Sequence, residues 1–289
     1  MIPLGLVLRN ARSQLSETLL LELNVAALEA QILLAHTFNK SRAYLLAHPE
    51  VTLDEVALSA FTDLLQRRLK GEPLAYILGR REFYGLEFYV TPDVLIPRPE
   101  TELLVELTLA LMPDRQPTQV LDLGTGSGAI ALAIAKLRPC AVVTAVDIAP
   151  KALKLAQRNA DRLALSNVRF IESDWFRGLN PIAQFDLIVS NPPYVAENDP
   201  HLFQGDVQFE PRQALQSGTD GLSDIRSIAQ AAQRFLAPHG RLLLEHGYNQ
   251  QVITKALLLS LGYTNVTGYY DFAGQARVTC GKRTQNMLK

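Results

Sequence analysis

The chain has 289 residues, of which 48% are apolar and 20% are charged, and its formal net charge is −1. This composition is typical of a soluble globular protein with room for one large domain and a small one. The near-zero charge argues against a protein that holds long nucleic acid mainly through phosphate contacts, so we expect no direct nucleic-acid target.

Cysteine and histidine spacing gives no sign of a metal site. Cys140 and Cys280 are far apart and lack Cys-x-x-Cys spacing, and the histidines show no ligand pattern. The N-terminus lacks the basic start and the cleavage site of a signal peptide, and no apolar run approaches membrane-spanning length. We therefore expect a cytoplasmic monomer without a bound metal or a membrane contact.

The first quarter of the chain is predicted to be helical. From Leu4 to about Lys70 it is rich in Leu and Ala at helical spacing, with almost none of the alternation that marks strands. One helix is expected over about Thr18 to Phe38. Another follows a capping-box pattern at residues 52–55 and ends at Gly71. Its apolar stripe consists of Ala57, Phe61, Leu64, Leu65 and Leu69.

A change of character near residue 75 predicts a domain boundary. Residues 76–78 and 83–90 are aromatic and β-branched around Gly79, which favours a β-hairpin in a linker over residues 73–92. We expect a helical domain at 1–72 and a second domain at 93–289. Basic residues gather beside the boundary, and a solvated face is favoured over contact with an acidic or RNA-bearing partner. They are Arg67, Arg68, Lys70, Arg80 and Arg81.

Strand and helix patterns alternate through the second domain, after a helix from about Glu100 to Leu111. The expected strands are Gln119–Leu123, Ala141–Asp147, Val168–Glu172, Asp186–Ser190, Gly240–Glu245, Thr264–Tyr270 and Arg277–Cys280. The expected helices are Ala129–Leu137, Pro150–Leu163, Asp224–Phe235 and Gln250–Leu261. Such alternation predicts an α/β fold with a mainly parallel, seven-stranded, doubly wound sheet. A long insertion, residues 195–221, follows the fourth strand as a binding element would.

A glycine-rich loop joins the first of these strands to its helix. The loop consists of Gly124, Thr125, Gly126, Ser127 and Gly128. Its glycines permit a tight turn and a close approach to a ligand, and their spacing fits S-adenosylmethionine enzymes better than a pyrophosphate site. Asp147 ends the second strand, where a carboxylate can accept hydrogen bonds from ribose hydroxyls.

The third and fourth strands end in further polar and aromatic residues. Asp174 is placed to accept from an adenine amino group, and Trp175 either covers the adenine ring or belongs to the core. Asn191 and the backbone carbonyl of Pro192 offer acceptors to a group that carries two hydrogens. Pro193 and Tyr194 complete this loop, and Tyr194 adds a flat face for the group to pack on. All four strand ends lie along one edge of the sheet, where open α/β sheets bind ligands.

These motifs together resemble one family closely. The order of strand ends resembles class I S-adenosylmethionine-dependent methyltransferases. The further details resemble the PrmC/HemK release-factor glutamine methyltransferases. The matching segments are 83–86 (FYGL), 96–102 (IPRPETE), 122–128 (DLGTGSG), 191–194 (NPPY), 210–215 (EPRQAL), 220–222 (DGL) and 245–247 (EHG).

The resemblance implies methyl transfer from S-adenosylmethionine to the amide nitrogen, N5, of the glutamine in the Gly-Gly-Gln motif of release factors. S-adenosylhomocysteine would be the product. Asn191, Pro192 and Tyr194 would be catalytic, residues 191–194 would bind the substrate, and Asn191 would also line the cofactor site. The helical domain would recognise the protein substrate.

Two rival functions are open. Enzymes that methylate adenine N6 or guanine N2 share an Asn/Asp-Pro-Pro-aromatic loop and would flip a base onto Tyr194. The near-neutral charge and the lack of a recognisable target-recognition domain argue against them. A non-enzymatic sensor of adenosylmethionine would leave residues 191–194 without a purpose. For Glu245, which ends the fifth strand, a structural hydrogen bond is favoured over a catalytic role.

Overall fold

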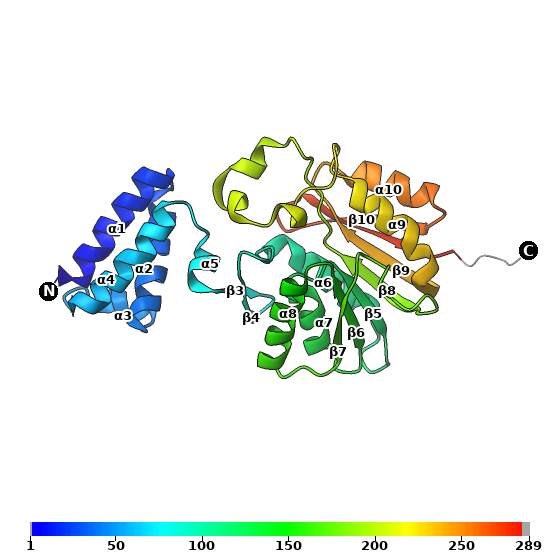
Figure 1. The fold of residues 1–289 in the computed structure, drawn as a ribbon, viewed down its shortest axis with the longest axis horizontal. Helices are drawn as coiled ribbons and strands as arrows, with labels where there is room; N and C mark the ends of the chain where they lie inside the picture. The colour runs from blue at the N-terminus through cyan, green and yellow to red at the C-terminus, as the bar shows by residue number, and fades with distance from the viewer. Residues whose placement is uncertain (1, 285–289) are drawn as a thin grey trace, which may run out of the picture. The chain divides into compact units, whose positions relative to one another are not determined.

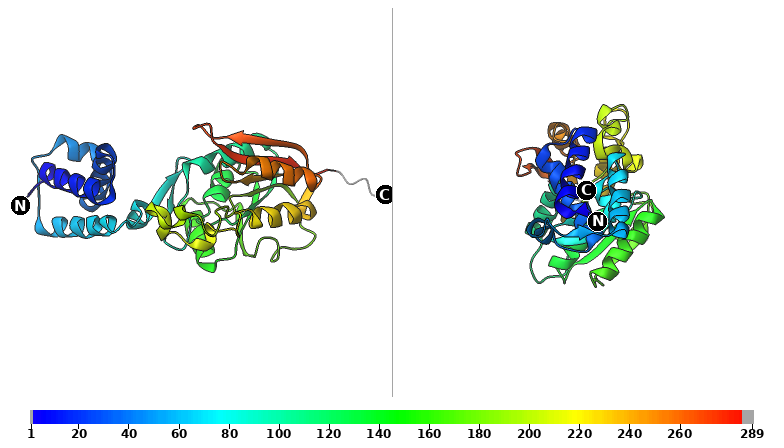
Figure 2. Two further views of the ribbon diagram at one scale, coloured as in Figure 1. Left: turned by 90° about the horizontal axis from the view of Figure 1, so that it is seen from above. Right: turned by 90° about the vertical axis from the view of Figure 1, so that its left-hand side faces the viewer.

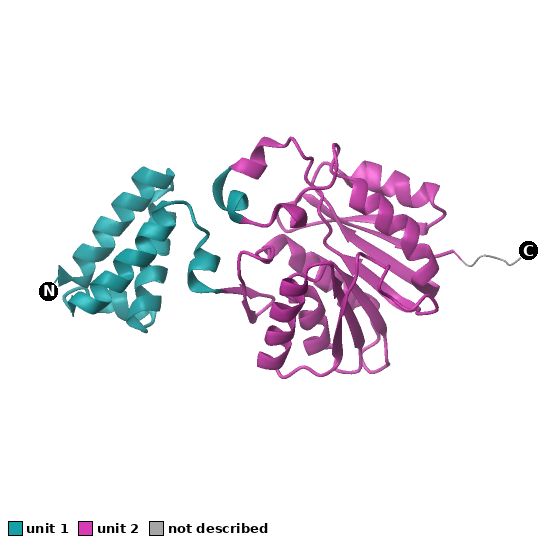
Figure 3. Ribbon diagram, viewed as in Figure 1, with its two compact units in different colours: residues 1–79, 204–209 teal, residues 80–203, 210–289 magenta. Residues whose placement is uncertain are grey.

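The computed structural model describes residues 2–284, which form two compact units. Unit 1 runs from the N-terminus to Gly79 and also includes Gln204–Phe209. Unit 2 contains the rest of the chain (Figure 3). Within residues 2–284, no helix is both long and apolar enough to cross a membrane.

Unit 1 is a small helical bundle (Figure 2). Its elements are β1 (Ile2–Pro3), α1 (Leu4–Leu19), α2 (Leu23–Phe38), α3 (Arg42–Ala47), β2 (Thr52–Leu53), α4 (Glu55–Leu69), α5 (Leu74–Leu78) and the 3₁₀ turn η3 (Gly205–Phe209). Leu4, Leu15, Leu33, Leu45 and Phe61 are among the buried side chains of its core. A helical domain was expected here.

Two details of this bundle differ from the sequence prediction. The predicted helix over Thr18–Phe38 is wrong at its start, because the chain turns at Leu20, whose φ is 55°. The apolar residues of α1 and α2 face one shared core, so the helical periodicity continues across the break. Helix α4 is capped by Asp54, whose Oδ1 accepts from the backbone N–H of Ala57 at 2.7 Å, and not by Thr52, which lies in β2.

The hairpin is also built differently from the prediction. Residues 76–78, expected to be extended, lie in the short helix α5 (Leu74–Leu78), which Gly79 ends with a φ of 69°. The strands are β3 (Arg80–Phe83) and β4 (Leu86–Tyr89), paired antiparallel. Tyr84 and Gly85 form the turn, with φ angles of 53° and 72°. The hairpin turn therefore begins at Tyr84, five residues after Gly79, where the sequence predicted it.

Unit 2 contains a seven-stranded sheet in the order β10-β11-β9-β8-β5-β6-β7 (Figure 1). The strands are β5 (Gln119–Leu123), β6 (Val142–Asp147), β7 (Val168–Glu172), β8 (Phe185–Ser190), β9 (Leu236–Glu245), β10 (Thr264–Tyr270) and β11 (Ala276–Lys282). Strands β5 to β9 pair in parallel, and β11 is antiparallel to both of its neighbours. All seven predicted strands are present, but β9 begins at Leu236 rather than Gly240 and β11 ends at Lys282 rather than Cys280, while β6 and β8 start within one residue of the prediction.

Helices cover both faces of this sheet. They are α7 (Ala129–Leu137), α8 (Pro150–Arg162), α9 (Ser223–Phe235) and α10 (Gln251–Ser260), and α6 (Glu102–Leu111) follows the 3₁₀ turn η1 (Pro99–Thr101). Val120 packs in one core with α6, α7 and α8, while the next residue, Leu121, packs in a second core with α9 and α10. This alternation fixes the register of the central strand, because a shift by one residue would exchange its two faces.

The chain order reverses between β5 and β8. Strands β6 and β7 extend the sheet on one side of β5, and β8 and β9 extend it on the other. In open α/β sheets, ligands bind in the crevice outside the carboxyl ends of the strands at such a reversal. The loops that begin at Gly124 and Asn191 lie at this point.

Candidate active site

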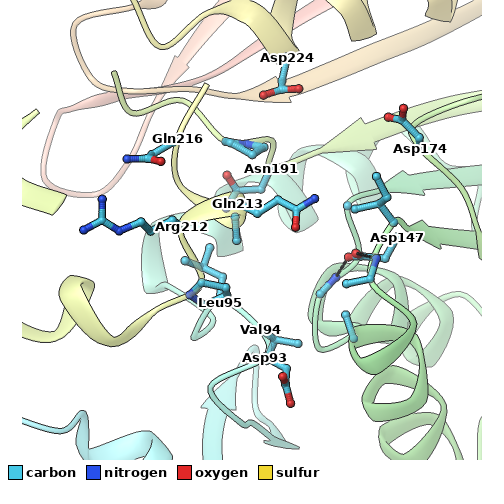
Figure 4. A pocket seen from close by; sticks show the side chains of 18 of the residues that line it. Asp93, Val94, Leu95, Asp147, Asp174, Asn191, Arg212, Gln213, Gln216 and Asp224 are labelled. Carbon is cyan, nitrogen blue, oxygen red and sulfur yellow. Dashed lines mark hydrogen bonds between the residues drawn. The ribbon is translucent and has the colours of Figure 1, made fainter. Parts of the chain in front are cut away.

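A cavity of about 400 Å³ lies at the carboxyl ends of the strands in unit 2 (Figure 4). The predicted site residues that line it are Gly124, Gly126, Asp147, Asp174, Trp175, Asn191 and Pro193. Thr125, Ser127, Gly128, Pro192 and Tyr194 are not part of its lining. Tertiary structure therefore brings four separate loops to one cavity, in agreement with the argument from strand ends.

The glycine loop is shaped by its backbone. Gly124, Gly126 and Gly128 all have positive φ angles, of 72°, 55° and 85°. A Cβ on Gly128 would lie 2.9 Å from Leu132 Cδ1, so this glycine is required by packing against α7. A Cβ on Gly126 would meet nothing within 4 Å. Gly126 is therefore the glycine whose exposed backbone can approach a ligand.

Asp147 joins the glycine loop to the start of α8. Its Oδ2 accepts from the backbone N–H of Gly126, and its Oδ1 accepts from that of Ala149, both at 2.9 Å. Burial raises the pKa of this carboxyl, and the backbone donors oppose the rise. Each carboxylate oxygen keeps a lone pair beyond these bonds, so Asp147 can still accept from hydroxyl groups in the cavity.

Trp175 is fixed against the wall of the cavity. Its indole Nε1–H donates to Asp224 Oδ1 at 3.2 Å, and Asp224 also accepts from the Ser217 hydroxyl at 2.8 Å. Two of its ring carbons lie 3.4 and 3.7 Å from the position of a Cβ on Gly124. Trp175 also packs beside the core under α9, so it is both a cavity wall and a core residue.

Asp174 lies at the same edge and forms an ion pair with Arg177 Nη1 at 2.7 Å. The Arg177 side chain is 84% exposed, so the pair lies at the surface end of the cavity. An exposed ion pair of this kind contributes little to stability. The Asp174 carboxylate is thus accessible to a ligand.

Asn191 reaches the cavity directly after β8. Its Nδ2–H donates to Thr101 Oγ1 at 3.1 Å, and Thr101 itself is buried. The preceding Ser190 donates its hydroxyl to the Leu123 carbonyl at 2.8 Å, which ties the end of β8 to β5. Because the amide nitrogen is bound on the protein side, the oxygen of the amide is the atom available to a substrate.

Tyr194 lies deeper than the sequence prediction assumed. It packs against the core under α9, and burial raises its pKa above the ordinary value, with the Glu245 carboxylate adding to the rise. Its backbone N–H donates to the Leu215 carbonyl at 3.2 Å. The role of Tyr194 as a platform for the substrate stays a prediction.

The insertion after β8 contributes cavity residues that sequence reasoning did not assign. Arg212, Gln213 and Gln216 line the cavity, as do Asp93 and Val94 from the segment before η1. The signal for Arg212 and Gln213 was the motif at residues 210–215, and Gln216 directly follows that motif. For Asp93 and Val94 the sequence offered only their position next to the 96–102 motif.

Glu210 connects the insertion with that earlier segment. It is 4% exposed and accepts from the backbone N–H of Ile96 at 3.0 Å and from the Arg98 guanidinium. Two motifs that are more than a hundred residues apart thus hold each other through one buried carboxylate. Removing one partner of such a pair leaves an uncompensated buried charge, so the two motifs depend on each other.

In residues 2–284, no three His, Cys, Asp or Glu side chains are grouped so that they could hold an ion. The two cysteines are free thiols, Cys140 exposed and Cys280 buried. The cavity therefore offers hydrogen-bond acceptors, an aromatic wall and backbone groups.

Comparison with known proteins places the chain in a family. Residues 114–269 match a methyltransferase domain, and residues 7–79 match the PrmC N-terminal domain. The release factor glutamine methyltransferase of Vibrio cholerae is 50% identical over 89% of each chain. That of Salmonella typhimurium is 50% identical over 89% of this chain and 92% of its own.

A solved structure shares the fold. A methyltransferase from Pyrococcus furiosus matches with a TM-score of 0.54 at 20% identity, over 77% of this chain and 99% of its own. At this identity the likeness concerns the fold alone. The identity with the Vibrio and Salmonella proteins over nine-tenths of the chain carries the family assignment. The chain belongs to the release factor glutamine methyltransferases and is an S-adenosylmethionine-dependent methyltransferase.

Proposed function

We propose that this protein methylates the side-chain amide nitrogen, N5, of the glutamine in the Gly-Gly-Gln motif of peptide-chain release factors. The relatives at 50% identity are named for this class of substrate. The observation that carries the proposal is the orientation of Asn191. Its amide N–H is bound by Thr101 at 3.1 Å, which leaves the carbonyl oxygen for a substrate that donates hydrogen bonds.

The cavity fits the cofactor of this reaction. Gly126 leaves an open approach to the loop backbone, Asp147 can accept from ribose hydroxyls, and Trp175 offers a flat wall for a purine ring. Asp174 also lines the cavity and would accept from the amino group of the adenine. S-adenosylmethionine, when bound, would supply a methyl group on a sulfonium sulfur, which leaves as the neutral thioether of S-adenosylhomocysteine when the S–CH3 bond breaks.

The glutamine amide nitrogen, which would receive the methyl group, is too weak a nucleophile to react without the protein. The lone pair of an amide nitrogen is delocalised into its carbonyl, which makes the nitrogen a poor nucleophile. Asn191 Oδ1 and the Pro192 carbonyl would accept from the two N–H bonds of the substrate amide, hold the nitrogen in line, and stabilise positive charge that develops on it. A nitrogen with two hydrogens is thereby selected over one with a single hydrogen.

The two units would have different roles in the reaction. All residues that line the cavity belong to unit 2, and the separate family match over residues 7–79 falls within unit 1. We propose that the domain at 1–72 recognises the release factor, that the segment at 73–92 links the domains, and that residues 93–289 perform the transfer. The protein would then act on release factors in the cytoplasm as a monomer.

Mass spectrometry tests the proposal directly. A recombinant release factor is incubated with the protein and S-adenosylmethionine that carries a labelled methyl group. The expected result is one labelled methyl on the glutamine of Gly-Gly-Gln, and none on a release factor with Asn in place of that glutamine. Oligonucleotides with unpaired adenine and guanine serve as the alternative substrates. Methylation of a base amine and not of the release factor would overturn the proposal.

A further inference from the structure

Two buried polar side chains lie behind Asn191. Thr101, at the end of η1, is 4% exposed, and Glu245, at the end of β9, is 1% exposed. Thr101 Oγ1 accepts from Asn191 Nδ2–H at 3.1 Å. The Thr101 hydroxyl also lowers the pKa of Glu245, as a donor that faces the charged carboxylate does. Asn191 is hydrogen-bonded to Thr101, and Thr101 interacts in turn with Glu245, so the three side chains form a polar chain that ends at the cavity.

The direction of this chain is set at its buried end. An ionised carboxylate only accepts hydrogen bonds, so the single hydroxyl proton of Thr101 must point toward Glu245. The Thr101 oxygen then has only lone pairs to offer Asn191, and it binds the –NH₂ side of that amide. The Asn191 oxygen consequently faces the other way. A flipped amide would place Nδ2–H against the substrate N–H groups. It would lose the hydrogen bond from the substrate to Asn191 and also the hydrogen bond from Asn191 to Thr101.

We infer that Glu245 is a positioning residue which, through Thr101, holds the Asn191 amide with its oxygen toward the acceptor nitrogen. This inference deepens the proposed function and rests on it for the identity of the substrate. Neither Glu245 nor Thr101 lines the cavity, so neither touches a ligand there directly. A buried carboxylate is costly to maintain, and its directional effect on an amide supplies a reason for its presence.

Charged groups surround Glu245 on several elements. Arg277 on β11 and Arg98 before η1 lower its pKa, while Glu100 in η1 raises it. Tyr194, in the loop after β8, also interacts electrostatically with Glu245, and His246 directly follows Glu245 in the sequence. Burial outweighs the favourable contacts and raises the pKa of Glu245 to about 7. Its Oε2 has no hydrogen-bond partner within residues 2–284, which is consistent with this rise.

Protonation of Glu245 should remove the preferred orientation of the Thr101 hydroxyl and, with it, that of the Asn191 amide. A protonated carboxyl can donate to Thr101, whose own proton is then free to point at Asn191 and to favour the flipped amide. The methylation rate should therefore fall as the pH drops below about 7. Glu245→Gln has both a donor and an acceptor at every pH, so it should be slow at all pH values and should lose this acid limb.

Substitutions at Thr101 test the role of its hydroxyl and the role of its packing separately. Thr101→Val keeps the shape without the hydroxyl, and Thr101→Ser keeps the hydroxyl. We expect Thr101→Val to lower the single-turnover methylation rate about tenfold with unchanged affinity for S-adenosylmethionine, and Thr101→Ser to stay within about twofold of wild type. Thr108→Val is the matched control, because the buried Thr108 hydroxyl only donates to the Leu104 carbonyl, at 2.7 Å.

A double-mutant cycle tests whether Thr101 acts through Asn191. If it does, Thr101→Val should cost nothing further in the Asn191→Ala background. Additive losses in the double variant would overturn the inference. So would equal losses in Thr101→Val and Thr101→Ser, because packing rather than the hydroxyl would then be responsible, or wild-type rates in both.

The hydrogen bond itself can be observed without any substrate. The ¹H–¹⁵N resonance of the Asn191 side-chain amide, identified by its absence in Asn191→Asp, should shift and exchange faster in Thr101→Val and in Glu245→Gln. An unchanged resonance in both variants would overturn the inference. If the wild-type protein fails to methylate release factors while this resonance responds as expected, the proposed substrate is wrong and the positioning chain stands.

Discussion

Asp147 Oδ2 accepts a hydrogen bond from the backbone N–H of Gly126 at 2.9 Å, across two neighbouring strand ends. The same carboxylate accepts from the backbone N–H of Ala149 at 2.9 Å, at the residue just before α8. One side chain thus shapes the glycine loop and presents acceptors to the cavity. Its loss should be felt both in ligand binding and in the geometry of the loop.

Asp147→Ala should weaken S-adenosylmethionine binding by at least about tenfold, because a charge-assisted hydrogen bond contributes about 1.5–3 kcal/mol. Asp147→Asn should lie between Ala and wild type, since the amide oxygen can accept but carries no charge. Isothermal calorimetry measures the affinities. Asp186→Asn is the matched control: Asp186 Oδ2 accepts from the Gln119 N–H at 2.8 Å, at the opposite edge of the sheet. Equal affinity in Asp147→Ala and wild type would contradict the assignment.

Arg68 should matter far more to stability than its neighbour Arg67. Arg68 is 6% exposed and binds Glu29 Oε2 at 2.8 Å and Asp206 Oδ1 at 3.0 Å, all within unit 1. Arg68→Ala leaves the partly buried Glu29 carboxylate without this cation and should cost about 3–5 kcal/mol in the stability of unit 1.

The control for Arg68 is Arg67→Ala. Arg67 pairs with Glu72, and its side chain is 44% exposed. Its loss should cost less than about 1 kcal/mol. Hydrogen exchange of the α2 and α4 amides, followed in both variants, reports on unit 1 separately from the sheet. Similar protection in the two variants would show that the Arg68 contacts do not stabilise the bundle.

Asp122 should make the protein less stable as the pH rises. It is fully buried, and burial raises its pKa from 3.8 to about 7 in the folded state, although the Thr125 hydroxyl donates to it at 2.7 Å. Between these two pH values the folded protein holds a proton that the unfolded chain releases. The contribution of Asp122 is therefore complete below about pH 4 and is lost as the pH rises through about 7.

Asp122→Asn removes this titration and keeps an acceptor for Thr125. Relative to wild type, its free energy of unfolding should rise between about pH 4 and pH 7 by a few kcal/mol at most, since one pKa unit corresponds to about 1.4 kcal/mol. Urea unfolding at a series of pH values provides the comparison. Parallel pH profiles for the two proteins would show that Asp122 stays ionised when buried.

Asn191→Ala should lower the single-turnover methylation rate on the order of a hundredfold while leaving the fold and the cofactor affinity nearly intact. Asn191→Asp keeps an acceptor but cannot donate to Thr101, which would then lie between two carboxyl groups. We expect it to retain more activity than Ala and much less than wild type. Asn180→Ala, in the turn after β7, is the control. Full activity in Asn191→Ala would leave residues 191–194 as a proline-terminated strand without a chemical role.

Unit 1 should be needed for the protein substrate and not for the cofactor. A variant without residues 1–79, and with Gln204–Phe209 replaced by a Gly-Ser link, removes both parts of this unit. If it is folded by circular dichroism, it should bind S-adenosylmethionine like the full chain. Its methylation of intact release factor should fall at least about tenfold, equivalent to 1.4 kcal/mol of lost binding. Equal activity of the two proteins would place substrate recognition in unit 2.

The sequence alone determined much of the catalytic half. Buried parallel strands are read from short apolar runs, and β5, β7 and β10 begin and end where those runs predict. The glycine loop and Asp147 could be assigned to the cavity because parallel strands bring their carboxyl ends to one edge. These features depend on local pattern and on one rule of topology.

Other features were decided only by tertiary contacts. Helix α1 ends before Leu20, where the chain turns so that α1 and α2 can pack on one shared core. Residues Leu74–Leu78 form a helix although their apolar and aromatic side chains are typical of a strand. Residues 204–209 join unit 1 through Asp206 and Arg68, which are 138 positions apart. Thr101 and Glu245 belong to the motifs at 96–102 and 245–247, but no sequence pattern shows that they lie behind Asn191. Hydrogen bonds between distant segments depend on how the elements pack, and neither periodicity nor propensity records that packing.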